Sequence, residues 1–101
     1  MKSPLKKGNV YRVTVEDAGS ANGETLRTLQ FEVEDREDMF TIVENLKRGS
    51  GLDEQDATKV GVALRLLGPV MMQNRKHPLL TDFMPHFKDF MVNLKKTMKG
   101  N

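Results

Sequence analysis

The chain has 101 residues, enough for one domain with a single hydrophobic core, and its 38% apolar and 30% charged residues are typical of a globular protein. It has no Cys, which excludes a disulfide framework, thiolate chemistry and a cysteine-based zinc site. No apolar run approaches the roughly 20 residues that span a bilayer, and no apolar h-region follows the basic N-terminus. We therefore expect a cytoplasmic protein of bacterial type, without a signal peptide or a membrane segment.

Two segments alternate apolar with polar residues, as half-buried strands do. The apolar positions are Tyr11, Val13 and Val15 in the first segment and Leu29, Phe31 and Val33 in the second. Residues 17–24 lie between them and contain Gly19, Asn22 and Gly23, which are typical of a hairpin loop. The pattern predicts an antiparallel β-hairpin whose apolar face needs cover from helices or from another sheet.

Two helix start signals follow the hairpin. Asp35 is the predicted N-cap of the first helix, with Glu37 and Asp38 in a first turn that favours negative charge. Apolar residues then recur at helical spacing until the glycines of residues 49–51 end the helix. Asp53 is the predicted N-cap of a second helix.

The second helix is predicted to be the central one, because more than half of its circumference is apolar. Gly68 and Pro69 interrupt it. Pro69 has no N–H and its ring clashes with the carbonyl of Arg65, so we expect either a kink or the end of the helix there. If the helix continues, it is predicted to stop by His77-Pro78.

A last helix is predicted with Pro85 in its first turn and three lysines near its C-terminal end. The fold class is therefore α+β: a two-stranded antiparallel β-hairpin followed by three helices packed on one face. Residues 1–8 are expected to be a flexible basic N-terminal segment, and residues 9–99 a single α+β domain. The predicted core contains Phe31, Phe40, Leu64, Leu67, Phe87 and Phe90.

Four blocks of the chain are distinctive in their order and spacing: YRVTVE, LQFEVEDREDMFTIVE, GVALRLLGPVMMQNRKHPLL and PHFKDFMVNLKK. Together, over residues 11–96, they resemble a small bacterial family known as a domain of unknown function (number 3861). The chain departs from that pattern at residues 35–38, where the family has Asn-His-Asp-Asp, and at Pro69, where the family has a helix former. The resemblance implies a compact α+β protein and carries over no catalytic or binding residue.

Few residues offer chemistry for a metal site. His77 and His86 flank the corner before the last helix, and with Asp82 or Asp89 they would form a minimal zinc site. They lie nine residues apart, whereas metal-binding pairs on one helix lie at i and i+4. Exposed histidines are the simpler interpretation, and we expect no metal and no cofactor.

Paired acids are the remaining candidates for catalysis. Glu32 and Glu34 alternate outward on a strand, and Asp35 and Asp38 occupy capping positions, so neither pair requires the special environment of a general acid–base pair. The chain also lacks a phosphate-binding loop, a nucleophile elbow and a dinucleotide fingerprint. We therefore expect a protein that is not an enzyme and has no catalytic residue.

A basic surface is the tentative binding site, formed by Arg75, Lys76, Lys95 and Lys96. Such a cluster can contact phosphate oxygens and could extend through Lys88 and Lys99 into a basic face, but the simpler interpretation is that Arg75 and Lys76 neutralise the C-terminal carbonyls of the long helix. The net charge is only +2 and no base-reading motif is present, so nucleic acid is disfavoured as a partner. The methionines are expected to fill gaps in the core, or alternatively to form an adaptable groove for a partner.

The expected function is that of a small non-enzymatic interaction module that self-associates as a homodimer. Residues 1–15 carry four bases and no acid, whereas residues 16–38 carry eight acids and two bases, and such opposite segments can orient a second copy. The predicted contact is the open edge of the hairpin or the apolar surface beside it. The alternatives are a different protein partner, weak nucleic-acid binding through the basic helix ends, and a ligand pocket between the hairpin and the kinked helix. No membrane association is expected.

Overall fold

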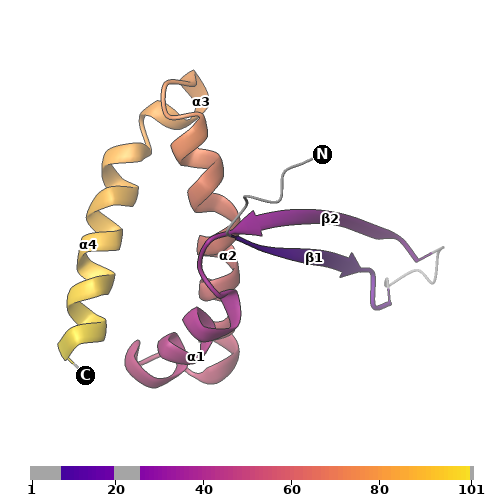
Figure 1. Cartoon of the computed structure of the whole chain (residues 1–101), viewed down its shortest axis with the longest axis horizontal. Helices are drawn as coiled ribbons and strands as arrows, with labels where there is room; N and C mark the ends of the chain where they lie inside the picture. The colour runs from indigo at the N-terminus through magenta and orange to yellow at the C-terminus, as the bar shows by residue number, and fades with distance from the viewer. Residues whose placement is uncertain (1–7, 20–25, 101) are drawn as a thin grey trace. The chain divides into compact units, whose positions relative to one another are not determined.

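The computed structural model of the chain describes residues 8–19 and 26–100. Its elements in chain order are β1 (Asn9–Glu16), β2 (Thr28–Asp35), α1 (Met39–Gly49), α2 (Glu54–Gln73), α3 (Pro78–Thr81) and α4 (Met84–Gly100) (Figure 1). The α+β class with an antiparallel hairpin followed by helices is therefore confirmed, although the helices number four where three were predicted. The chain forms two compact units, residues 1–37 with the hairpin and residues 38–101 with the helices.

The hairpin pairs β1 with β2 from Asn9 opposite Asp35 to Glu16 opposite Thr28. This register sets Val13 opposite Phe31 among the apolar positions and Arg12 opposite Glu32 on the other face, where the two side chains form an ion pair at 3.2 Å. The predicted alternation is thus correct. The predicted burial is wrong for Phe31, which stays exposed.

The loop between the strands begins as predicted. The N–H of Asp17 donates to the carbonyl of Arg27 at 2.8 Å, and Gly19 has a φ of 139°, which residues with a side chain rarely adopt. The other two predicted turn residues, Asn22 and Gly23, lie outside the described residues, as does most of the N-terminal segment predicted to be flexible.

The first helix starts three residues later than predicted, because Asp38 and not Asp35 is its N-cap. The Asp38 carboxylate accepts the N–H groups of Phe40 at 3.0 Å and Thr41 at 3.4 Å. Asp35 ends β2, and its carboxylate accepts the N–H of Glu37 at 3.0 Å. An aspartate can close a turn in this way as readily as it caps a helix, so the sequence alone does not decide between the two roles.

The joint between α1 and α2 follows the sequence prediction closely. The first helix ends at Gly49, and Gly51 has a φ of 86°, the left-handed conformation expected of a glycine after a helix. Asp53 is the N-cap of α2, and its carboxylate accepts the N–H of Asp56 at 2.8 Å. The last residues of α1 therefore turn directly into the start of α2.

The two helices pack closely because α2 presents a glycine to α1. A Cβ built on Gly61 would lie 2.9 Å from Cγ2 of Val43 and 3.1 Å from Cδ1 of Leu46. Among the described residues, the buried apolar side chains are Met39, Val43, Leu46, Ala57 and Met71. The core of the helical unit therefore centres on the crossing of α1 with α2.

The long helix runs through Pro69 and ends at Gln73, so of the two outcomes left open at Gly68-Pro69, a kink or the end of the helix, the end did not occur. The short helix α3, which the sequence analysis missed, follows. His77 is its N-cap: Nδ1 accepts the N–H of Leu79 at 3.1 Å, and the His77 carbonyl accepts the Thr81 hydroxyl at 2.8 Å. Pro85 lies in the first turn of α4, as predicted.

Much of the predicted core is exposed. Phe40 is 70% exposed and Phe90 is 43% exposed, and Leu67 is exposed as well, while Leu64 and Phe87 are only partly buried. All residues of α4 are described, and none of them is buried. The apolar spacing correctly identified one side of each helix, but spacing does not tell whether another element covers that side.

Candidate functional site

Two close approaches set α4 against the other helices of its unit. A Cβ built on Gly68 of α2 would lie 3.9 Å from Cζ of Phe87, which identifies the sides of α2 and α4 that face each other, and one built on Gly49 at the end of α1 would lie 3.3 Å from Cε of Met98 in α4. The other side chains of α2 and α4 lie on one flank or the other of the line along which these two helices face each other. This is because each successive residue is turned by 100° around the helix axis.

One flank is apolar. Phe83 and Phe90 are seven residues apart, so they lie two turns apart on the same side of the chain leading through α4. Leu67, one residue before Gly68, is the exposed apolar residue of α2 on this flank. All three side chains are exposed. We call these three residues the apolar face.

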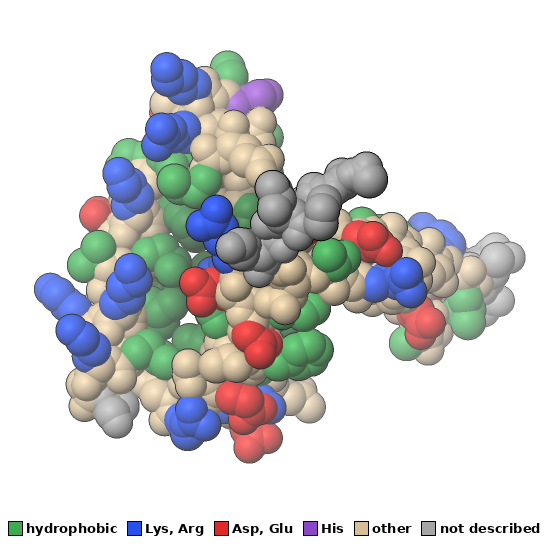
Figure 2. Space-filling view, in the orientation of Figure 1, with side chains coloured by type: hydrophobic (Ala, Val, Ile, Leu, Met, Phe, Trp, Pro, Cys, Tyr) green, Lys and Arg blue, Asp and Glu red, His purple; other side chains and the backbone are tan. Residues whose placement is uncertain are grey.

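The opposite flank is basic. Lys88, Lys95 and Lys99 of α4 recur at seven and four residues and therefore share one side of the helix. Lys88 and Phe90 are two residues apart, which turns them about 200° from each other around the helix axis. Figure 2 shows basic side chains along α4 and apolar side chains in the space between α4 and α2.

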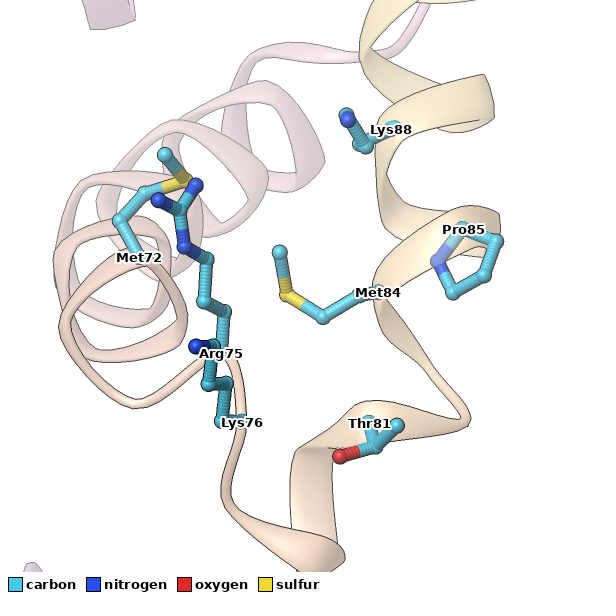
Figure 3. A pocket seen from close by; sticks show the side chains of 7 residues that line it. All are labelled: Met72, Arg75, Lys76, Thr81, Met84, Pro85 and Lys88. Carbon is cyan, nitrogen blue, oxygen red and sulfur yellow. The ribbon is translucent and has the colours of Figure 1, made fainter.

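A pocket of about 420 Å³ lies on the basic flank, where α2, α3 and α4 meet. Its lining residues are Met72, Arg75, Lys76, Thr81, Met84, Pro85 and Lys88. Met84 extends from α4 toward Met72 and Arg75 at the end of α2, and Lys88 follows one turn further along α4 (Figure 3). We call this pocket and its three cations the basic corner.

The corner is held by hydrogen bonds of the chain that links α2 to α4. The N–H of His77 donates to the Asn74 carbonyl at 2.8 Å, and the N–H of Leu80 donates to the His77 carbonyl at 2.9 Å. The N–H of Phe83 donates to the Leu80 carbonyl at 3.1 Å, and the Phe83 carbonyl accepts the N–H of Phe87 at 2.9 Å. The turn is thus hydrogen-bonded from the end of one helix to the start of the next.

The end of α2 is capped by Asn74 rather than by the cations that follow it. The Asn74 side-chain amide donates to the carbonyl of Val70 at 2.8 Å, and its backbone N–H donates to the same carbonyl at 3.1 Å. Arg75 and Lys76 had been given this role as the simpler interpretation of the basic cluster. Within residues 8–19 and 26–100, the structure records no hydrogen bond or ion pair of the Arg75, Lys76 or Lys88 side chain.

The structure brings together only part of the tentative basic surface. Arg75 and Lys76 line one pocket with Lys88, whereas Lys95 and Lys96 lie further along α4 and do not line it. Lys88 was not one of the four predicted residues, although the sequence allowed the cluster to extend through it into a basic face. Met72 and Met84 had been proposed only as part of a methionine groove and Pro85 not as a lining residue, since the short helix α3 sets α4 beside the end of α2.

The structure does not bring the candidate metal ligands close together. His77 Nδ1 is engaged as the cap of α3, and His86 is exposed on α4. In the described part of the chain, no three His, Asp or Glu residues lie close enough to hold a metal ion together. Of the paired acids, Glu32 pairs with Arg12, and the Asp35 and Asp38 carboxylates accept backbone N–H groups.

The methionines divide between the two roles proposed for them. Met39 and Met71 are buried, as side chains that fill the core are expected to be. Met72, adjacent to Met71, is exposed and lines the basic corner with Met84. Among the described helices, none has the length and apolar character that a membrane crossing requires.

Comparison with known proteins identifies a family and one solved relative. The model of a family described as a Domain of Unknown Function with solved structure (DUF3861) matches residues 9–96. The chain is also similar to a protein of unknown function from Pectobacterium atrosepticum SCRI1043, whose crystal structure shares 39% sequence identity with a TM-score of 0.77. That match covers 88% of this chain and 98% of the other. No curated protein matches the chain.

Proposed function

Since the chain belongs to the DUF3861 family, whose description names no activity, we propose a function from its surfaces alone. The protein is a non-enzymatic interaction module that associates with a second copy of itself through the apolar face of α2 and α4. Three of the four acids considered for general acid–base catalysis support the non-enzymatic part, because Glu32 is engaged with Arg12 and the Asp35 and Asp38 carboxylates with backbone N–H groups.

The observation that carries the proposal is the exposure of α4. Its apolar residues recur at helical spacing, yet none of its 17 residues is buried. The apolar face adds Leu67 of α2 to Phe83 and Phe90, and all three are large exposed side chains. Monomeric soluble proteins rarely expose a continuous apolar patch of more than a few hundred Å², and larger patches mark interaction sites.

The size of this surface suits a second copy. A helix of 20 residues is about 30 Å long and one of 17 residues about 25 Å, and each is about 10 Å wide with its side chains. Two such helices project an area of roughly 500 Å², and side-chain relief enlarges it toward the roughly 800 Å² per partner of a stable interface. Two such helical pairs form a four-helix bundle when their apolar sides meet.

We place the contact on the helices rather than on the strand edge that the sequence suggested. Covering the apolar face removes three large apolar side chains from water, and this burial is the main driving force of association. Pairing at a strand edge supplies chiefly backbone hydrogen bonds, which exchange for hydrogen bonds to water and contribute about 1 kcal/mol each. None of the three side chains is charged, so their contact across a two-fold axis brings no like charges together.

Sedimentation of the wild type and of Phe90→Asp tests the proposal. We expect a wild-type dimer at high micromolar concentration and a dissociation constant raised at least about tenfold in Phe90→Asp, because the variant buries an unpaired carboxylate in the interface. Val92→Asp is the matched control. Val92 is also an exposed apolar residue of α4, 56% exposed, but it lies about 160° around the helix from Phe90.

Val92→Asp should therefore dimerise like the wild type. A wild type that sediments as a monomer at about 100 µM would contradict the proposal and leave the apolar face to a different occupant. Equal weakening by the two substitutions would also contradict it, because the interface would then not follow the Phe90 side of α4.

A further inference from the structure

The basic corner combines an apolar floor with a cationic rim. Met72, Met84 and Pro85 supply the apolar atoms, and Arg75, Lys76 and Lys88 supply three positive charges. None of the described lining residues is acidic. An unbranched thioether side chain adapts its shape to an apolar partner, and two of the three floor residues are methionines.

The three cations lack partners in the described part of the chain. Because Asn74 caps the C-terminus of α2, the backbone does not occupy Arg75 or Lys76, and no ion pair engages Lys88. Like charges around one pocket repel each other, and a bound anion replaces this repulsion with attraction. The guanidinium of Arg75 offers a planar pair of donors that matches a carboxylate.

The volume of the corner fits a small ligand. About 420 Å³ lies at the lower end of the range of roughly 300 to 1,000 Å³ that ligand pockets occupy. The floor is aliphatic, and no aromatic side chain lines the pocket to stack on a base. Nucleic-acid sites without sequence preference depend on such stacking, so the lining favours an aliphatic ligand over a nucleotide.

From this combination we propose that the basic corner binds an aliphatic carboxylate, an acyl chain that ends in a single anionic carboxylate group. The chain lies on Met72, Met84 and Pro85, and the carboxylate meets Arg75, Lys76 and Lys88. This site is independent of the proposed self-association, because Lys88 and Phe90 lie on opposite flanks of α4. Either proposal can fail without the other.

Titration of the protein with decanoate, at decanoate concentrations too low for micelles to form, tests the site. With ¹³C-labelled methionine methyl groups, we expect saturable shifts of the Met72 and Met84 resonances, whereas the buried Met71 resonance stays in place. Decyltrimethylammonium has a chain of the same length with the opposite charge, and butyrate has the same charge with a short chain. Both should bind at least about tenfold more weakly than decanoate.

The variant Arg75→Gln/Lys76→Gln/Lys88→Gln tests the contribution of the three rim cations to binding. All three side chains are exposed, so the substitutions leave folding intact, and we expect decanoate affinity to fall at least about tenfold. The matched control Lys95→Gln/Lys96→Gln/Lys99→Gln removes three charges from the same unit outside the pocket and should bind as the wild type does.

Three results would overturn the proposal. The first is the absence of a saturable shift at Met72 and Met84. The second is equal binding of decanoate and decyltrimethylammonium, which would make the pocket merely apolar. The third is a single-stranded oligonucleotide that displaces decanoate from the corner, which would assign the cations to phosphate.

Discussion

Leu46→Ala is expected to destabilise the protein by about 2 to 5 kcal/mol, the range found when a buried leucine is cut back to alanine. Leu46 is only 3% exposed, and its Cδ1 is one of the atoms that meets α2 at Gly61. The substitution removes buried methyl groups and leaves a cavity at the crossing of α1 with α2. Chemical denaturation at one fixed protein concentration measures the change, so that any self-association contributes equally to both samples.

Leu79→Ala is the matched control because it deletes the same atoms from a site that is 78% exposed. Its effect on the free energy of unfolding should stay below about 1 kcal/mol. If both leucine variants unfolded at the same denaturant concentration, the α1–α2 crossing would not be the core of the helical unit.

Gly61→Ala is expected to destabilise the protein by about 1 to 3 kcal/mol through overpacking. Helix propensity alone predicts the opposite sign, since alanine is favoured over glycine inside a helix by about 1 kcal/mol. The close packing overrides this preference. The new Cβ would lie 2.9 Å from Cγ2 of Val43, a side chain whose branching at Cβ leaves it little freedom to move aside.

Gly68→Ala is the control that separates the effect of close packing from the effect of helix propensity within the same helix. The nearest side-chain atom to a Cβ at Gly68 is Cζ of Phe87 at 3.9 Å, an ordinary contact distance. The propensity gain is offset by the position before Pro69, where a side chain is disfavoured in helical conformation, so we expect a change within about 1 kcal/mol of zero. Stabilisation by Gly61→Ala would contradict the close approach of α1 and α2.

Local sequence signals predicted the elements well wherever the signal residue had only one possible structural role. The period-two alternation of both strands matches the observed register, and Asp53 caps α2 as its position before an apolar stripe indicated. The glycines after α1 also ended it as predicted, with Gly51 in the left-handed conformation. At the two helix ends the backbone hydrogen bonds that define the element lie within a few residues of the signal.

The errors arose where two residues could fill the same structural role, or where tertiary structure decided whether a side chain is buried. Asp35 and Asp38 are equally suitable caps, and the turn closed by Asp35 moved the start of α1 to Met39. At Pro69 the sequence had left a kink and the end of the helix as alternatives, and α2 continues past it to Gln73, since propensity is a weak constraint on a long helix. The predicted core failed at Phe40 because an apolar helix position does not reveal whether a neighbour covers it.

The candidate site was predictable only as a cluster in sequence. Arg75 and Lys76 are adjacent, so their shared location needed no structure. Their approach to Lys88 depends on the turn through His77 and α3, whose hydrogen bonds involve a histidine cap that the sequence analysis had considered as an exposed residue or a metal ligand but not as a cap. The exposure of Met72 beside the fully buried Met71 likewise depends on helix rotation, which moves neighbouring residues by about 100°.

Because the apolar face and Lys88 lie on opposite flanks of α4, self-association through the apolar face would leave the basic corner exposed. A two-fold dimer joined through its apolar faces keeps Lys88 of each copy on an outward side, so it presents two identical basic corners to solvent. Two sites on one rigid particle act bivalently: once one corner holds a tethered carboxylate, the second meets its partner at a high effective concentration. A weak single site would then become a strong attachment to any object that offers two such groups at the matching separation.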